Sequence, residues 1–219
     1  MNGNPFWINE GRDSVRHKYY FAKAAVIASG YIHEIEWQSS LDLSELSETS
    51  FLKELAWVIL SAGMKEQVIR GIFPKISLCF FEWKSAEMIN LKHDECLIKA
   101  YPLFRNKQKI SAIIESANIL ITLGFRELKE RLLMGDFKAL NMFPYIGPVT
   151  AYHLAKNLGL QVAKPDRHLS KISVALGYTD VQGLCSDVSM ITGDKIPVVD
   201  TVFWRFANLE PNYIKLLSL

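Results

Sequence analysis

The chain has 219 residues, of which 49% are hydrophobic and 22% are charged, and its net charge is +2. This balance excludes an intrinsically disordered chain and indicates a folded protein with an ample core, as one large domain or two small lobes. The mildly basic charge is compatible with a polyanionic partner and does not by itself demonstrate one. The first residues lack the apolar stretch of a signal peptide, and no apolar run is long enough to cross a bilayer, so we expect a soluble, cytoplasmic protein without a membrane partner.

Apolar residues recur along most of the chain with the 3.6-residue period of amphipathic helices. In the first half, the polar residues 33–50 predict a surface connection, and Pro74 predicts a break that divides residues 64–83 into two short helices. The other helices of this half are expected at residues 14–30, with Ser14 as a candidate N-cap, and at 51–62, 94–104 and 106–124.

The second half continues in the same pattern after Gly124. Helices are expected at residues 125–133, 136–142, 149–159, 167–177 and 181–192, with a last one starting at Pro197. Residues 77–83, SLCFFEW, could pass as a strand, but a single strand has no partner. The sequence therefore predicts an all-α fold.

The three cysteines, Cys79, Cys96 and Cys185, lie far apart and form no C-x-x-C pair. This spacing argues against a zinc finger, an iron–sulfur cluster or a disulfide framework. We expect buried thiols without a chemical role.

Residues 143–155, FPYIGPVTAYHLA, place two prolines and a glycine directly before a helical pattern. Gly147 supplies a conformation that most residues resist, and Pro148 suits the first turn of a helix because it lacks an N–H. We expect two helices joined by a tight hairpin, in which the second helix exposes backbone N–H groups that form an anion site. A DNA phosphate fits this site, although an ordinary helical hairpin without a ligand has the same turn chemistry.

Asp166 follows the hairpin after a short crossing segment, at the predicted start of the next helix. An aspartate in this place is most often a helix N-cap, which accepts hydrogen bonds from the first backbone N–H groups. A carboxylate close to a strand held by the hairpin is also suited to chemistry on DNA. Both interpretations stay open on these residues alone.

Residues 140–172 resemble the helix-hairpin-helix and aspartate signature of the HhH-GPD superfamily of DNA repair enzymes, which includes endonuclease III, adenine glycosylase and 3-methyladenine glycosylase. The family hairpin reads close to L-P-G-I-G-x-K/x-T-A, and a catalytic Asp follows, often as D-x-H. Here the hairpin reads FPYIGPVTA, and Asp166 lies 17 residues after Val149, with His168 completing D-x-H. Weaker likeness in AWVILSAGMKEQVI and LFRNKQKISAI extends the resemblance to residues 51–177.

The resemblance implies a DNA glycosylase that forms a single unit over residues 1–219, with a two-lobed, all-α architecture. We expect a helical lobe over residues 30–135 and a second lobe, made of residues 1–29 plus 136–219, that carries the hairpin and the acid. Double-stranded DNA is the implied partner of a monomer that acts in the cytoplasm at the nucleoid. The implied substrate is a flipped, damaged or modified base, and Asp166 is the implied catalytic residue, which stabilises an oxocarbenium-like sugar and orients water.

The chain departs from the family pattern in ways that bear on its chemistry. Members that also cut the strand carry a lysine where this chain has Val149, so the resemblance implies base removal without strand cleavage, because that position offers no amine for a Schiff base. The four-cysteine cluster of some relatives is absent. Tyr145 replaces the first hairpin glycine, and Ala62, Gly63 and Met64 stand where relatives carry polar wedge residues.

The resemblance assigns further residues to the site. DNA contacts are expected from Tyr145, Ile146, Gly147, Val149, Thr150, Lys107, Lys164, Arg167 and His168. The resemblance places Ala62, Gly63 and Met64 at the wedge. Independently of the resemblance, the aromatic rings of Trp57 and Tyr101 are candidates for the base pocket, although rings at helical spacing are more often core residues. Lys109 and Lys156 are further candidates for phosphate contacts, although a single lysine is more often a solvated surface charge. The chemistry requires no cofactor, and the family allows a structural Na⁺ or K⁺ bound by the backbone carbonyls of Asn141, Phe143 and Ile146.

Alternatives stay open for the catalytic acid, for the function and for the excised base. Asp200, in VVDTVFWRF, is a second acid, but it lies 53 residues after Gly147 and is better interpreted as the N-cap of the last helix. The whole chain could be a non-catalytic helix-hairpin-helix DNA-binding protein in which Asp166 only caps a helix, or a glycosylase/lyase that uses another amine. The excised base could be an alkylated purine, a deaminated or mismatched pyrimidine, or a bulky modified base of foreign DNA, in housekeeping repair or in defence.

Overall fold

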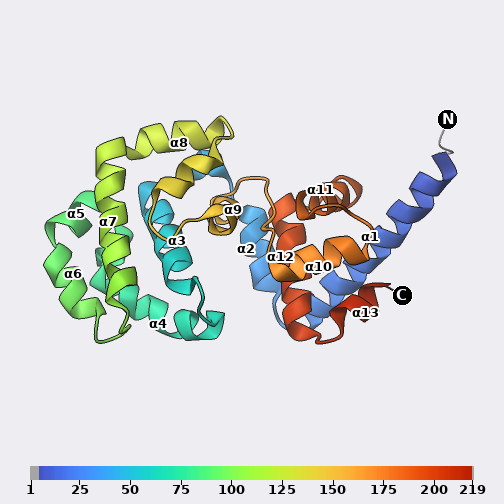
Figure 1. Cartoon of the computed structure of the whole chain (residues 1–219), viewed down its shortest axis with the longest axis horizontal. Coiled ribbons are helices and arrows are strands. Elements are labelled where there is room, and N and C mark those ends of the chain that lie inside the picture. The colour runs from blue at the N-terminus through green and yellow to red at the C-terminus, as the bar shows by residue number, and fades with distance from the viewer. Residues whose placement is uncertain (1–4, 219) are drawn as a thin grey trace. The chain divides into compact units, whose positions relative to one another are not determined.

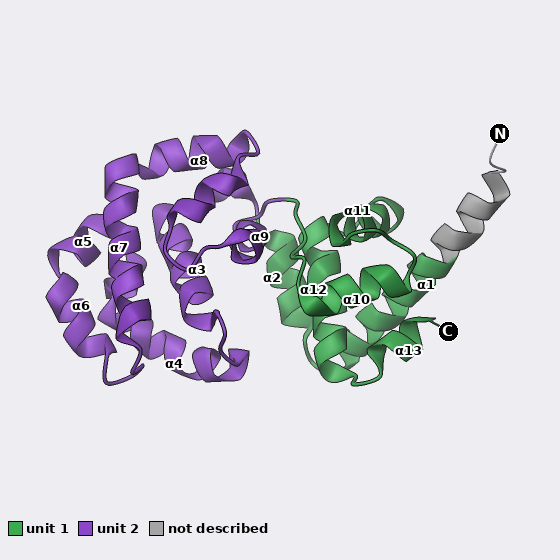
Figure 2. Cartoon of the chain, viewed as in Figure 1, with its two compact units in different colours: residues 1–41, 161–219 green, residues 42–160 purple. Residues whose placement is uncertain are grey.

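The computed structural model describes the backbone of residues 5–218 and the side chains of residues 14–218. All regular structure in this part of the chain is helical, which confirms the predicted all-α class (Figure 1). The chain divides into two compact units, one of Met1–Leu41 with Gln161–Leu219 and the other of Asp42–Leu160 (Figure 2). These boundaries differ from the expected lobes because residues 32–40 pack with the C-terminal helices, whereas the hairpin packs with the helix at residues 48–61.

The first unit is built around its longest apolar helix, α12 (Ile196–Leu209). The helices that contact α12 are α1 (Pro5–Ala28), α2 (Ile32–Ser40), α10 (Arg167–Ala175) and α11 (Val181–Thr192), and α13 (Tyr213–Ser218) packs on α10. Val202, Phe203 and Phe206 of α12 are fully buried, and the Phe203 ring meets Tyr19 edge-on at a centroid distance of 5.6 Å. Burial of each such side chain stabilises the fold by about 1.5–3 kcal/mol.

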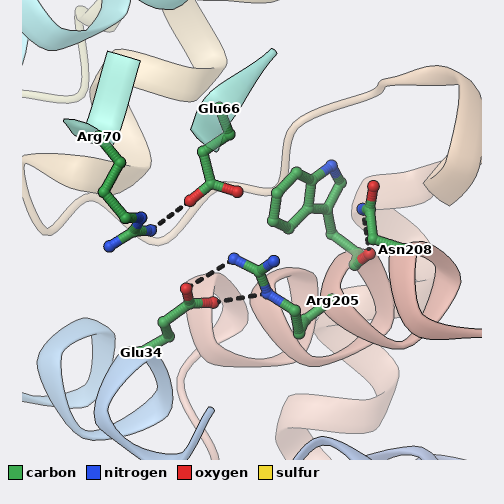
Figure 3. Close-up of polar contacts among 6 residues, drawn as sticks. Glu34, Glu66, Arg70, Arg205 and Asn208 are labelled. Atoms are coloured by element: carbon green, nitrogen blue, oxygen red, sulfur yellow. Dashed lines mark hydrogen bonds and ion pairs between the residues drawn. The ribbon is translucent and has the colours of Figure 1, made fainter. Parts of the chain in front are cut away.

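A partly buried ion pair joins α2 to α12 within this unit (Figure 3). The Arg205 guanidinium donates to both carboxylate oxygens of Glu34, at 2.9 and 2.6 Å, and lies 4.2 Å from the centre of the Tyr31 ring. Arg205 is 8% exposed, so both its charge and its donors serve the fold. Figure 3 also shows Arg70 paired with Glu66, one turn earlier on the same helix of the other unit.

The second unit packs its helices around α3 and α7. In chain order its elements are η1 (Leu43–Glu45), α3 (Glu48–Ser61), α4 (Glu66–Cys79), η2 (Phe81–Trp83), α5 (Ala86–Leu91), α6 (His93–Ala100), α7 (Lys107–Leu123), α8 (Phe125–Leu133), η3 (Phe137–Met142) and α9 (Pro148–Asn157). Ser47 and Asn106 cap α3 and α7 through side-chain oxygens, as their residue types favour.

The C-terminal end of α9 is held tightly against the start of this unit. Gly159 has φ +95°, and a Cβ there would lie 2.8 Å from the Leu43 backbone nitrogen, so no larger residue fits. Asn157 donates to the Glu54 carboxylate at 3.0 Å, which joins α9 to α3. These contacts fix the helix that follows the hairpin.

Several predicted elements were wrong in ways that tertiary packing explains. Ser14 lies inside α1, which begins at Pro5, so it is not an N-cap. Residues 33–50 are not a surface connection but contain α2, η1 and the start of α3, because Ile35 and Gln38 are buried. α4 continues through Pro74, since its buried face, with Ile69, Phe73 and Ile76, outweighs the lost hydrogen bond.

The three cysteine thiols are free and buried, as predicted. Burial raises the pKa of Cys96 to about 11 and also raises that of Cys79, so these thiols are not nucleophiles at neutral pH. Within residues 14–218, no three His, Cys, Asp or Glu side chains lie together in a way that would bind a metal ion. None of the described helices has both the length and the apolar character required to cross a membrane.

Candidate active site

The predicted hairpin is present between η3 and α9, in the unit Asp42–Leu160. Phe143 anchors it: the ring is 2% exposed and lies 5.3 Å from the Phe51 ring of α3. The turn closes through a hydrogen bond from the Ile146 N–H to the Phe143 carbonyl at 3.1 Å. Ile146 is 3% exposed, so its side chain is a core residue, and any DNA contact there comes from its backbone.

The first turn of α9 leaves its backbone donors uncapped by side chains. Gly147 is the N-cap and has no side chain, and Pro148 occupies the first turn. Thr150 Oγ1 accepts from the Gly147 N–H at 2.7 Å and donates to the Tyr145 carbonyl at 2.9 Å. This arrangement leaves the helix N-terminus open to an anion, and Val149, 44% exposed, stands beside it.

The loop after α3, in the same unit, has the small residues of the predicted wedge. Ala62 is half-buried, Gly63 has φ +69°, and Met64 is 41% exposed. The Lys109 ammonium, on α7, donates hydrogen bonds to the carbonyls of Leu60 and Ala62, at 2.6 and 2.5 Å. The loop is therefore tied to α7 at its first residue.

Two of the phosphate candidates, Lys109 and Lys156, do not have the expected exposure. Lys109 is 4% exposed, and burial lowers the pKa of its ammonium below the ordinary lysine value. Lys156 is 8% exposed. Both lysines were placed at the surface by residue type alone, and both are buried because α7 and α9 turn these positions inward. Lys107, at the start of α7, is exposed as expected.

The two aromatic pocket candidates differ in their surroundings. Trp57 of α3 is half-buried, meets Phe73 edge-on at 5.1 Å and lies under the Arg70 guanidinium at 5.8 Å. Tyr101, at the end of α6, is 46% exposed. Trp57 thus serves the core of the unit, whereas the Tyr101 ring is accessible.

Asp166 lies in the other unit and is the N-cap of α10, as predicted. Its Oδ1 accepts from the backbone N–H groups of His168 and Leu169, at 2.9 and 3.1 Å. Among the side chains of residues 14–218, none donates to its second oxygen, Oδ2. One oxygen thus fixes the carboxylate, and the other can accept a further hydrogen bond.

The side chains of half-buried Gln182 and buried Asp200 hold the segment that leads to Asp166. Gln182 of α11 accepts from the Ala163 N–H at 2.9 Å, and Asp200 Oδ2 accepts from the Lys164 N–H at 2.6 Å. The Lys164 carbonyl then accepts from the Asp166 N–H at 2.8 Å. Asp200 is therefore linked to the candidate acid through one residue.

The prediction that Asp200 caps the last helix is wrong. α12 begins at Ile196, so Asp200 lies inside it and is 1% exposed. Its position in a valine-rich run, VVDTV, indicates that Asp200 is buried inside the helix. A carboxylate inside an apolar helix requires a buried donor. That donor lies 36 residues away in the sequence, which no local pattern identifies.

The residues beside Asp166 differ in their contacts and in their exposure. His168 Nδ1 lies 3.1 Å from the Tyr213 hydroxyl, and Arg167 donates its Nε–H to His168 Nε2 at 3.2 Å. Because Nε2 accepts, the neutral imidazole carries its proton on Nδ1 and donates to Tyr213. Burial lowers the pKa of His168, which favours this neutral form. Arg167 is exposed and Lys164 is half-buried.

Comparisons with known proteins agree with this architecture at the level of the fold. No family model and no curated protein matches the sequence. The chain is similar to a solved structure of Methanocaldococcus jannaschii 8-oxoguanine glycosylase/lyase in complex with a 15mer DNA containing 8-oxoguanine. The sequences are 16% identical, the TM-score is 0.53, and the alignment covers 87% of this chain and 98% of the other. The two chains share an all-α fold.

Proposed function

We propose that this protein is a DNA glycosylase that hydrolyses the N-glycosidic bond of a flipped base in duplex DNA and leaves an abasic site. The observation that carries the proposal is Asp166, with one carboxylate oxygen fixed by two backbone N–H groups and the other available. It follows a hairpin whose second helix begins with uncapped backbone donors. The structural neighbour is named as a glycosylase/lyase and was crystallised with DNA, which supports the same substrate class.

In the proposed mechanism the phosphate backbone binds the N-terminus of α9, and one nucleotide is extruded from the stack. Departure of the base leaves positive charge on the sugar, as in glycoside hydrolysis. The ionised carboxylate of Asp166 stabilises that charge and orients the attacking water. Exposed Lys107 and Arg167 add attraction for phosphates.

The proposed chemistry stops at the abasic site. Strand cleavage by a glycosylase/lyase requires an accessible amine that forms a Schiff base with the sugar. The hairpin position next to Pro148 is Val149, and Lys109 and Lys156 are buried. Lys164, two residues before Asp166 and half-buried, is the amine to examine by substitution with Met.

The remaining parts of the proposal concern the cofactor, a structural cation, the oligomeric state and the location of the protein. Hydrolysis by a carboxylate requires no cofactor. The backbone carbonyls of Asn141, Phe143 and Ile146 would hold a structural Na⁺ or K⁺, which would supply positive charge for a phosphate. Of these, the Phe143 carbonyl already accepts the turn-closing hydrogen bond. We propose a monomer that acts on chromosomal or foreign DNA in the cytoplasm.

The test is base release from a panel of duplexes with alkylated, oxidised, deaminated, mismatched and phage-type modified bases, with hot alkali to reveal abasic sites. Asp166→Asn retains a capping side chain, so α10 stays folded while the carboxylate charge is lost. We expect alkali-dependent breaks with the wild type and a loss of at least about a hundredfold in rate with Asp166→Asn.

The matched control is Asp180→Asn, since Asp180 caps α11 in the same unit through the Gly183 N–H at 2.8 Å. Its rate should equal that of the wild type. Borohydride trapping on the same duplexes detects an imine and would reassign the protein as a glycosylase/lyase. Equal binding of all duplexes by wild type and Asp166→Asn, without breaks, would favour a non-catalytic DNA-binding protein.

A further inference from the structure

Tyr145, in the hairpin, has an unusual combination of backbone and side-chain properties. Its φ is +65°, in the left-handed region that disfavours every residue with a Cβ and suits glycine. Tyr145 is nevertheless 40% exposed, so its side chain is not part of the core of the unit. A large, partly exposed aromatic side chain in a strained position indicates a role outside the packing of the fold.

The hydrogen bonds that fix this turn do not involve the Tyr145 side chain. Thr150 Oγ1 donates to the Tyr145 carbonyl, the Gly147 N–H donates to Thr150, and the Ile146 N–H donates to Phe143. All these partners remain when residue 145 is glycine. The backbone geometry of the hairpin therefore does not explain the tyrosine.

The surroundings of the ring connect it to the loop after α3. The Lys109 ammonium lies 5.7 Å from the ring centre and donates to the carbonyls of Leu60 and Ala62. The next residue of that loop, Gly63, has open space where a Cβ would lie. The Lys109 ammonium thus links the ring to a loop that has small residues without polar side chains at Ala62 and Gly63.

We propose that the Tyr145 ring stacks against the bases that border the gap in duplex DNA from which a nucleotide has been extruded. Aromatic rings stack on any base because every base has a π-face, and side chains inserted at a base step stabilise unstacked DNA. The Lys109 ammonium, held by the carbonyls of Leu60 and Ala62, adds positive charge 5.7 Å from the ring centre. This inference rests on the proposed function, since the gap arises from base flipping.

The experiment compares binding to a duplex that contains a stable abasic-site analogue with binding to the intact duplex, alongside thermal unfolding of each variant. Tyr145→Gly and Tyr145→Asn both suit the left-handed conformation, and Tyr145→Phe retains the ring. We expect Tyr145→Gly and Tyr145→Asn to unfold at the wild-type temperature or above it and to lose about tenfold in affinity for the abasic duplex, the size of one lost stack. Tyr145→Phe should bind within about threefold of the wild type, because stacking does not need the hydroxyl.

Glu82→Gly is the matched control, because Glu82 is exposed in the same unit and has φ +52°. It should raise the unfolding temperature and leave affinity unchanged. Wild-type affinity in Tyr145→Gly, an equally large loss in Tyr145→Phe, or a loss of stability that parallels the loss of affinity would each overturn the inference. If the wild type releases bases but the Tyr145 variants bind normally, this inference alone fails; if the wild type neither releases bases nor prefers the abasic duplex, the proposed function fails with it.

Discussion

At the scale of single residues, Asp200 is the side chain that most directly fixes the approach to Asp166. Asp200→Ala removes the carboxylate that accepts from the Lys164 N–H, and the loss of such a charge-assisted hydrogen bond costs about 1.5–3 kcal/mol of stability. Because Lys164 in turn accepts from the Asp166 N–H, we expect the single-turnover rate of base release to fall by about tenfold or more while duplex affinity is retained.

Asp200→Asn keeps an oxygen acceptor and should recover most of the rate. The control is Asp187→Ala, which removes the acceptor of the Tyr178 hydroxyl in the same unit and should lower stability without changing the rate. Equal rates in Asp200→Ala and the wild type, or a change confined to DNA affinity, would show that Asp200 does not position the acid.

His168 gives the protein a pH dependence whose sign follows from its lowered pKa. Between that lowered value and the ordinary value near 6.5, the unfolded chain binds the proton and the folded chain does not. The free energy of unfolding therefore rises with pH in this window, and the contribution of His168 is lost as pH falls from neutral through 6.5 toward the folded pKa.

Urea unfolding of the wild type and of His168→Gln between pH 5 and pH 7 measures this effect. The wild type should lose stability on acidification more steeply than the variant, because glutamine does not titrate. Parallel pH profiles would mean that the neutral imidazole, bonded to Tyr213, has no energetic preference in the folded state.

At the scale of elements, η2 is a turn of three consecutive residues with positive φ, none of them glycine: Phe81, Glu82 and Trp83. Buried Trp83 accounts for it, since its ring stacks on Phe80 at 5.0 Å and its indole N–H donates to Ser77 at 2.9 Å. Glu82 is exposed, so Glu82→Gly removes strain without loss of packing.

We expect Glu82→Gly to stabilise the protein by about 0.5–1 kcal/mol, the left-handed penalty less the entropic cost of glycine. Chemical denaturation measures the difference. Trp83→Gly, which relieves the same kind of strain but removes a buried ring, should instead destabilise by several kcal/mol. A destabilised Glu82→Gly would show that the turn is not strained.

Most of the helices can be predicted from local sequence. The wrong predictions share one cause, which is tertiary packing. α3, α7, α8, α10 and α11 lie near the predicted ranges because each combines a periodic apolar face with a cap or a glycine stop. α2 was missed because its polar residues cover a narrow buried face at Ile35 and Gln38. The break at Pro74 was wrong because α4 draws its stability from packing, which sequence propensity does not include.

At the scale of the whole molecule, the candidate site depends on contacts between neighbouring residues and on contacts between residues far apart in the sequence. The hairpin and the capping role of Asp166 were predictable, since both depend on neighbours within a few residues. The tie from Lys109 to the loop after α3 and the contact of Asp200 with Lys164 join residues 47 to 49 and 36 positions apart. Such contacts follow from the fold and from no local motif.

The measurement that tests the account most directly is the release of free bases, detected by mass spectrometry of the small-molecule fraction. DNA that has been alkylated, oxidised or deaminated, together with phage DNA that carries modified bases, is incubated with the wild type, Asp166→Asn or Asp180→Asn. We expect at least one base to be released by the wild type and by Asp180→Asn and not by Asp166→Asn. No base released above the Asp166→Asn background, from proteins that all bind the duplex, would contradict a glycosylase that acts through this carboxylate.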